Sequence, residues 1–370
     1  MNFNWQQSDW PNFTVNLAEI NPLLSRFSEK LGALRVLLSS FDADIVLDRT
    51  LVELGNEAVD TSAIEGIHIN RDAVMSSVCS RLGRKGSFKH LHDAAADGFA
   101  EMIVNVRSNY EANLTRPMLY KWHKLLFKGS RAAISTGKFR THTESMMVLG
   151  GGIEGNDIRF IAPPSKQVGH EMTHFINWFN SSKIETETGL LHPAVRASIA
   201  HLYFESIHPF EDGNGRIGRM LICKVIAQHI GLPVLLPISV AIRAVRNDYY
   251  EAIHAASRSN EITEWCKFFT RILSQSLDAM TEELIFIVKK IQFFRTYTPT
   301  LNPRQIKVLQ RLADEGPKGF LGGMNATKYQ RIALTSKATA TRDLAELYRL
   351  GALIRIGSGP SIRYHLPFTE

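Results

Sequence analysis

Residues 208–219 read HPFEDGNGRIGR, and this stretch decides how the rest of the chain is interpreted. It contains a histidine, an aspartate, two glycines on either side of an asparagine, and two arginines three positions apart. Apolar residues recur at helical spacing before it, over 198–206, and after it, over 216–230. We therefore expect a loop that joins two helices and runs directly into the second one.

This loop has the composition of a phosphate-binding site. The first backbone N–H groups of a helix lack partners within the helix and carry the positive end of its dipole, so they attract anions. Gly213 and Gly215 can both take positive φ and form a nest around Asn214. Arg216 and Arg219 share one face of the following helix, where both guanidinium groups can reach phosphate oxygens.

Two more groups in the loop suit a metal ion and a proton transfer. Asp212 supplies a hard oxygen ligand of the kind that holds a hydrated Mg²⁺ beside phosphates. His208 is free to act as a general base or as a nucleophile. Each feature alone is usually structural, because His-Pro pairs end helices, Gly-Asn-Gly forms turns and paired arginines face solvent. Their occurrence together and in this order favours a catalytic site.

The stretch resembles the HPFx[D/E]GNGRxxR signature of the Fic family of protein adenylyltransferases and matches it at every specified position. The resemblance implies that His208 deprotonates a Tyr, Thr or Ser hydroxyl of a target protein, which attacks the α-phosphate of ATP and retains AMP. Asp212 would hold Mg²⁺, and Phe210 would be an apolar plug. Gly215 favours AMP transfer, because family members that transfer the γ-phosphate carry a larger basic residue there.

The same resemblance implies which residues bind ATP. Arg219 would meet the γ-phosphate, and the preceding residues of the loop would cradle the phosphates. Tyr249 and Tyr250 stand where family members line the adenine pocket, and core packing explains the two tyrosines equally well. The implied nucleotide-binding residues are Asp212, Gly213, Asn214, Gly215, Arg216, Ile217, Gly218, Arg219, Tyr249 and Tyr250.

A second motif lies far upstream, in a helical pattern over 51–69. Thr61 and Glu65 are four positions apart and share one helix face, and Gly66 is placed where a helix stops. TSAIEG at 61–66 resembles the [S/T]xxxE[G/N] inhibitory-helix motif of Fic proteins. The resemblance implies that Glu65 pairs with Arg219 where the γ-phosphate would bind, so that the enzyme is autoinhibited.

Two other segments fit the catalytic domain of this family. Residues 114–127 resemble its first helix. Residues 137–168 contain glycines, an Asn-Asp pair and a Pro-Pro pair, which together predict a β-hairpin. The corresponding Fic element is the flap, whose edge strand pairs with the target backbone, and an ordinary surface hairpin is the alternative. The candidate target-binding residues are Ile158, Arg159, Phe160 and Ile161.

We expect a mainly α-helical chain in three parts. A helical module over 1–105 contains the inhibitory helix, a helical Fic catalytic domain with its small hairpin covers 106–295, and a winged-helix-like domain covers 302–370. The first part also has an apolar cluster that is expected to clamp onto a neighbouring surface, at Trp5, Trp10, Pro11 and Phe13.

The last part is basic, with eleven Lys or Arg and four Asp or Glu over 302–367, an excess equal to the net charge of +7. Its three helical patterns and terminal hairpin resemble a winged helix. Major-groove readers place base contacts near the start of the third helix, which here follows Ser336 as N-cap. DNA and protein both remain open as its partners. The residues at that position are Lys337, Thr339, Thr341 and Arg342.

Composition limits the remaining possibilities. A chain of 370 residues with 44% hydrophobic content is ample for two or three domains. Three scattered cysteines and a first segment unlike a signal peptide favour the cytoplasm, and charges and prolines interrupt the most apolar segment, so we expect no membrane span. The alternative function is a DNA-binding regulator with the Fic domain as nucleotide sensor, but a sensor has no need of His208. A homodimer stays open.

Overall fold

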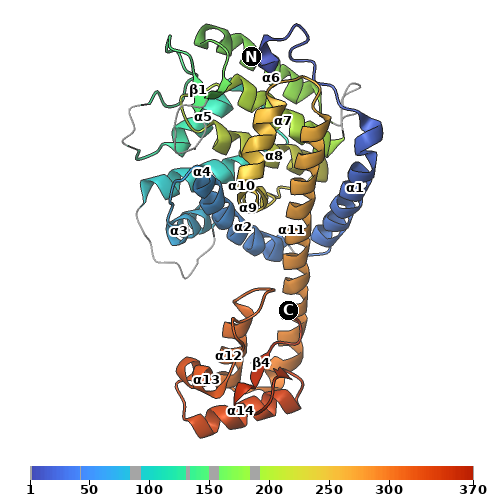
Figure 1. Cartoon of the computed structure of the whole chain (residues 1–370). Helices are drawn as coiled ribbons and strands as arrows, with labels where there is room; N and C mark the ends of the chain where they lie inside the picture. Colours follow the sequence, from blue (N-terminus) through green and yellow to red (C-terminus); the bar gives the residue numbers. More distant parts are fainter. Residues whose placement is uncertain are drawn as a thin grey trace. The chain divides into compact units, whose positions relative to one another are not determined.

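The computed structural model describes residues 2–41, 43–83, 93–130, 134–149, 158–183 and 192–369. Over these residues the chain forms two compact units, 1–278 and 279–370. The described part contains fourteen α-helices and two short antiparallel sheets, which confirms the expectation of a mainly helical fold (Figure 1). None of the described helices combines the length and the apolar character needed to cross a membrane.

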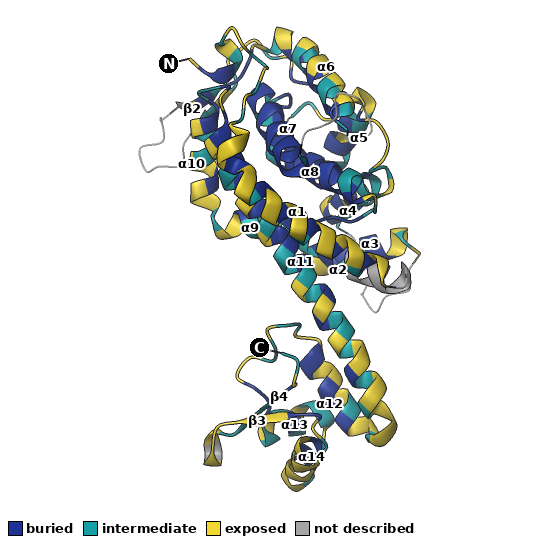
Figure 2. Ribbon diagram, turned by 90° about the vertical axis from the view of Figure 1, so that its right-hand side faces the viewer, coloured by how far each residue is buried: buried dark blue, intermediate teal, exposed yellow. Residues whose placement is uncertain are grey.

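Two helices, α7 and α8, form the centre of the first unit. Both are buried on nearly all sides, as their dark ribbons in Figure 2 show, because helices this apolar around their circumference need neighbours on every face. The helices and 3₁₀ turn of this unit are η1 (Asn4–Gln6), α1 (Leu17–Ser39), α2 (Ala43–Ile64), α3 (Arg71–Arg81), α4 (Ala94–Ser108), α5 (Arg116–Leu126), α6 (Ser165–Ser181), α7 (Pro193–Ile207), α8 (Asn214–Ile230), α9 (Ile238–Ala244) and α10 (Arg246–Ala256).

Local signals explain where two of these helices begin and end. The Thr115 hydroxyl accepts a hydrogen bond from the Met118 N–H at the start of α5, and Pro117 lies in its first turn, where no N–H partner is needed. Helix α2 ends at Ile64, and Gly66 follows with φ +75°, a conformation that glycine adopts without a Cβ penalty.

The predicted hairpin is present as a two-stranded sheet. Strands β1 (Met147–Leu149) and β2 (Ile158–Ile161) pair antiparallel, with Val148 opposite Phe160 and a register irregularity after Val148. Residues 150–157, which connect the strands and include the predicted Asn-Asp turn, lie outside the described residues.

The second unit has the element order expected for residues 302–370. Asn302 and Gln305 form a reciprocal capping box at the first of its helices, and the Ser336 hydroxyl caps the third. A bridge between Met324 and Tyr364 joins the small sheet to the segment before the second helix. The boundary between the units falls within α11 (Thr263–Tyr297), which is followed by η2 (Thr298–Thr300), α12 (Pro303–Ala313), α13 (Ala326–Ala333), α14 (Lys337–Arg349), β3 (Ile354–Ile356), η3 (Gly359–Ser361) and β4 (Arg363–His365).

Candidate active site

A pocket of about 810 Å³ lies where the α7–α8 loop, the end of α2, the flap and α10 meet. Most of the predicted site residues line it. Seven predicted residues are not among its lining: Thr61, Gly66, Ile158, Ile161, Arg216, Ile217 and Gly218. The predicted residues among its lining are Glu65, Arg159, Phe160, His208, Asp212, Gly213, Asn214, Gly215, Arg219, Tyr249 and Tyr250.

His208 lies directly after α7, at the junction with the loop. Its backbone has φ 50° and ψ 60°, a left-handed conformation that costs a non-glycine residue about 1–3 kcal/mol and that tertiary contacts must support. The buried Arg140 provides such contacts, because its Nε donates to the His208 carbonyl at 2.7 Å and its backbone N–H donates to the Pro209 carbonyl at 2.9 Å. This left-handed conformation of His208 turns the chain sharply from α7 into the loop.

The protonation state of His208 suits a base. Burial of the imidazole, followed by the nearby charge of Arg140, lowers its pKa from 6.5 to about 4. The side chain is 16% exposed and stands 3.8 Å from the Glu205 carboxylate, one helical turn earlier. The imidazole is therefore neutral near pH 7 and free to accept a proton.

The loop after His208 is held by its own side chains and by α5. The Asn214 amide donates to the Phe210 carbonyl and its oxygen accepts from the Phe210 N–H, both at 2.9 Å. Phe210 is fully buried, and its ring stacks on His123 with centroids 4.1 Å apart. His123 Nδ1 accepts from the Gly137 N–H, so its Nε2 carries the proton and donates to the Asp212 carbonyl at 3.0 Å. Asn214 thus shapes the loop, and His123 is a support that the sequence did not indicate.

The two glycines of the motif are needed for different reasons. Gly213 has φ +82° at the start of α8, and an added Cβ would lie 2.7 Å from Leu126. Gly215 does not take positive φ, so the expectation of a nest with two such glycines is wrong, because helix α8 already begins at Asn214. A Cβ on Gly215 would instead lie 2.4 Å from the Glu65 carboxylate oxygen. Gly215 therefore leaves space for a group that approaches the start of α8.

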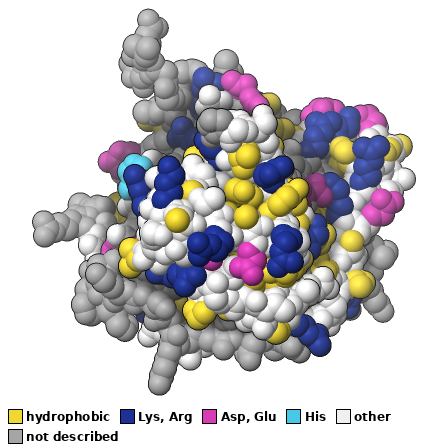
Figure 3. Space-filling view, turned by 90° about the horizontal axis from the view of Figure 1, so that it is seen from below, with side chains coloured by type: hydrophobic (Ala, Val, Ile, Leu, Met, Phe, Trp, Pro, Cys, Tyr) yellow, Lys and Arg dark blue, Asp and Glu magenta, His cyan; other side chains and the backbone are white. Residues whose placement is uncertain are grey.

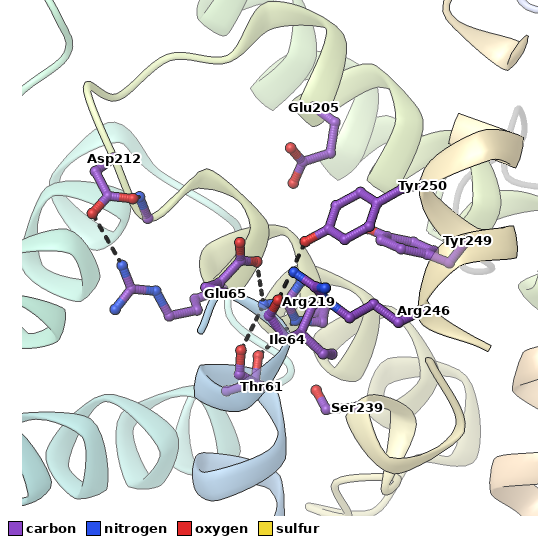
Figure 4. A network of polar contacts seen from close by, with 12 residues as sticks. Thr61, Ile64, Glu65, Glu205, Asp212, Arg219, Ser239, Arg246, Tyr249 and Tyr250 are labelled. Atoms are coloured by element: carbon purple, nitrogen blue, oxygen red, sulfur yellow. Dashed lines mark hydrogen bonds and ion pairs between the residues drawn. The ribbon is translucent and has the colours of Figure 1, made fainter. Parts of the chain in front are cut away.

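Arg219 and the end of α2 form a polar network (Figure 4). The fully buried guanidinium donates through Nη2 to Glu65 Oε1 at 2.7 Å and to the Thr61 carbonyl at 2.9 Å, and through Nε to the Thr61 hydroxyl at 2.6 Å. Burial opposes ionisation of Glu65, but the charge and hydrogen bond of Arg219 outweigh it and hold the pKa of this carboxyl below its usual 4.5. Both groups are charged, and the buried guanidinium is paired with a carboxylate whose side chain is 29% exposed.

Arg216 contacts Asp212 and the Phe127 ring. Its Nη2 is 3.4 Å from the Asp212 carboxylate, and its guanidinium carbon stands 5.1 Å from the centre of the Phe127 ring. The Asp212 side chain is 56% exposed, so its carboxylate remains accessible from the pocket. Ile217 is fully buried and packs in the core, while Gly218 has no room for a Cβ beside Glu205 and His201.

Helix α10 contributes the aromatic wall of the pocket. Tyr249 is buried, with its hydroxyl 2.7 Å from His201 Nε2, whereas Tyr250 is 38% exposed. Tyr250 also donates to the Ile64 carbonyl at 3.5 Å, and Arg246 donates to the same carbonyl at 2.9 Å (Figure 4). Arg246 was not among the residues predicted from the sequence, although it precedes Tyr250 by four residues and so shares its helix face.

Glu205, like His123 and Arg246, was not among the residues predicted from the sequence. Burial, and then the charge of Glu65, raise its pKa from 4.5 to about 8, so this carboxyl is neutral near pH 7. The sequence feature that could have indicated Glu205 is its position three residues before His208, which places both at the end of one helix.

The geometry brings a neutral histidine, the start of a helix and a buried arginine to one pocket, and comparisons with known proteins show which proteins the chain is similar to. Residues 113–226 match the Fic/DOC family, and residues 3–84 match a domain of unknown function, DUF4172. Two relatives are the protein adenylyltransferases Fic of Aedes aegypti, 28% identical over 68% of this chain and 46% of its own length, and Fic of Nematostella vectensis, 31% identical over 32% and 26%. The chain spans less than half the length of the curated relatives it matches.

Solved structures show the same fold. A Fic family protein from Desulfovibrio desulfuricans G20 covers 97% of this chain and 99% of its own length at a TM-score of 0.56 and 20% identity. Fic-1 of C. elegans, residues 134–508, covers 74% and 75% at a TM-score of 0.51 and 17% identity. Residues 113–226 therefore form a Fic/DOC family domain.

Proposed function

We propose that this protein is a protein adenylyltransferase that transfers AMP from ATP to a Tyr, Thr or Ser hydroxyl of a target protein. The observation that carries the proposal is one pocket in which a neutral His208 faces the start of α8 beside Arg219 and the flap. The matches to proteins named protein adenylyltransferase Fic support the same activity.

In this proposal the pocket residues divide the work by their chemistry. His208 takes the proton from the acceptor hydroxyl, whose oxygen bonds to the α-phosphorus of ATP while the bond to pyrophosphate breaks. The free N–H groups at the start of α8 and the guanidinium of Arg219 stabilise the phosphate charge. Tyr250 and Arg246 on α10 line the side available to the adenine.

Mg²⁺ fits this donor set as a phosphate-bridging ion. Asp212 offers an exposed carboxylate at the pocket, and the described residues contain no cluster of three or more metal-binding side chains. A single carboxylate is what Mg²⁺ uses when phosphates and water supply its other ligands. Bound Mg²⁺ would neutralise charge on the phosphates, and Asp212 is the residue that would hold it.

Autoinhibition by Glu65 is part of the proposal. Three of the hydrogen bonds that Arg219 makes go to Thr61 on α2 and to Glu65 just after it, so in this state its Nε and Nη2 donors are not available to a γ-phosphate. A phosphate would also meet the Glu65 carboxylate beside Gly215. Productive ATP binding therefore requires Glu65 to leave.

We extend the proposal to the domain organisation given by the sequence: an N-terminal module over 1–105, the catalytic domain over 106–295, and a winged helix over 302–370. The order α12, α13, α14, β3, β4 with the Met324–Tyr364 bridge supports the last assignment. Figure 3, a view that includes the C-terminal unit, shows Lys and Arg side chains around exposed apolar ones. Lys337, Thr341 and Arg342 are exposed at the start of α14, which supports a phosphate backbone as a partner.

The test of the catalytic proposal is transfer from α-labelled ATP with Mg²⁺. In a Glu65→Gly background we expect label to enter protein, and the additional His208→Ala change to abolish it while the far-UV spectrum and melting temperature stay unchanged. Label entering at the same rate without His208 would rule out this residue as the base. Label from γ-labelled ATP alone would point to phosphate transfer instead.

A further inference from the structure

The N-terminal segment Phe3–Trp5 contacts the flap at two places. Trp5 Nε1 donates a hydrogen bond to the Ile161 carbonyl at 2.7 Å. The buried Phe3 ring meets Phe160 edge-on with centroids 4.9 Å apart, and both belong to one small apolar cluster with Ala162. One contact is to the main chain of β2 and the other is to its side chain.

The hydrogen bond from Trp5 reaches an edge of the hairpin that pairs with no strand among the described residues. The Ala162 N–H donates to the Met146 carbonyl, so residues 160 and 162 direct their main-chain groups toward β1. Ile161 lies between them, and its carbonyl must point away from β1. Trp5 therefore supplies the donor that a third strand would otherwise provide.

The residue between Phe3 and Trp5 is attached to the catalytic helix. Asn4 is fully buried, and its amide donates to the Ser206 hydroxyl at 2.8 Å, two residues before His208 on α7. Its backbone N–H donates to the Ser257 carbonyl at 2.8 Å, at the end of α10. Three consecutive residues thus link the flap to the elements that carry His208 and the pocket tyrosines.

We propose that Phe3–Trp5 is a tether that sets the distance between the flap and His208, with Trp5 as its positioning residue. The proposal rests on the proposed function, because it assigns to the start of the DUF4172 match the task of presenting the target hydroxyl to the base. A two-stranded sheet of three and four residues is marginal by itself, so its position depends on what holds its edges. The tether acts on the acceptor protein and leaves the nucleotide site untouched.

Two variants separate this role from general stability. Trp5→Phe keeps an aromatic ring and removes the N–H that reaches the flap. Trp10→Phe is the matched control, because Trp10 also lies before α1 and also donates one indole hydrogen bond. That bond goes to Oε2 of Glu171 on α6, at 2.9 Å. Both variants are made in the full chain with Glu65→Gly.

The first measurement is hydrogen exchange of the flap amides. We expect Trp5→Phe to speed exchange of the Ala162 amide and its neighbours in β1 and β2 about fivefold, the effect of losing one ordinary hydrogen bond. Trp10→Phe is expected to leave these amides unchanged. Unchanged flap exchange in Trp5→Phe, or equal acceleration in both variants, overturns the tether.

The second measurement is transfer of labelled AMP to a His208→Ala copy of the same chain, used as the protein acceptor. We expect Trp5→Phe to lower kcat/KM for this acceptor about fivefold with no change in ATP affinity, and Trp10→Phe to match the parent. Faster flap exchange with unchanged transfer would overturn the positioning role. If the Glu65→Gly parent transfers no AMP to any protein, the proposed function fails, while the exchange measurement still decides the tether.

Discussion

At the residue scale, the site depends on how one arginine is shared. Arg219 is fully buried and donates to Glu65 and Thr61, so its charge is satisfied by α2 rather than by a ligand. A buried guanidinium that loses its carboxylate partner must find another anion, because an unpaired buried charge is costly. The proposed inhibition therefore also prepares Arg219 to receive a phosphate.

The change Glu65→Gly tests this exchange of partners. We expect AMP transfer to rise by at least about tenfold, because the charge-assisted pair opposing phosphate is worth about 1.5–3 kcal/mol. Adding Arg219→Ala should remove most of the gain. Rates with α-labelled ATP at saturating Mg²⁺ measure both effects.

Asp60→Asn is the control for the Glu65 prediction. It breaks the 2.5 Å ion pair between Asp60 on α2 and Arg243 on α9 without touching Arg219, and we expect little change in rate. Equal activation by Asp60→Asn would mean that any loosening of α2 suffices. Activity of Glu65→Gly at or below the wild-type level, with equal melting temperatures, would contradict the inhibitory role.

At the scale of the element, α2 is fixed by contacts along its length. Its last carbonyl, on Ile64, accepts from Arg246 and Tyr250 of α10. Two turns earlier, the buried Glu57 carboxyl accepts from the Ser239 N–H and hydroxyl at the start of α9. The position of Glu65 thus follows from how the whole helix packs.

Glu57 gives α2 a pH-dependent stability. Burial raises its pKa from 4.5 to about 7, against the lowering effect of the Ser239 hydrogen bonds. A raised carboxyl pKa stabilises the fold fully below the unfolded value, and this contribution is lost as pH rises through the folded value. Compared with Glu57→Gln, the wild-type free energy of unfolding should fall by about 2 kcal/mol more between pH 5 and pH 8. Urea titrations at the two pH values measure the difference, and parallel pH dependence in the two proteins would contradict it.

At the scale of the whole molecule, the chain combines the proposed catalytic pocket in unit 1–278 with a separate basic unit, 279–370. The second unit has its own core, built around Leu309, Leu344 and Leu347, and buried Tyr329 donates to Asp343 at 2.8 Å. Its exposed basic residues are therefore available for a partner rather than needed for folding.

Binding of duplex DNA by the second unit is expected to fall steeply with salt, because each neutralised phosphate releases counterions. Lys337→Ala or Arg342→Ala should weaken retardation of a DNA duplex at low salt and reduce the salt slope by about one. Lys318→Ala, an equal loss of exposed charge away from α14, is the control. A duplex that is not retarded at low salt by the wild-type chain would redirect this unit to a protein partner.

Local rules predicted much of this molecule. The helices at 116–126, 303–313 and 337–349 begin at the caps that their sequences indicate, because a cap involves neighbours within three residues. The wrong prediction for the φ of Gly215 also came from a local rule. Glycine adopts positive and helical φ equally well, and Gly215 is helical because α8 begins at Asn214. The sequence alone does not specify the first residue of a helix this closely.

The sequence by itself determined the chemistry of the loop at 208–219, because a histidine, an aspartate and two arginines follow one another within twelve residues there. Only the tertiary structure decided which distant groups meet that loop. Arg219 and Glu65 are 154 residues apart, and Trp5 and Ile161 are 156 apart. Such contacts follow from how the buried faces of α2, α7 and α8 pack, and no local spacing encodes them.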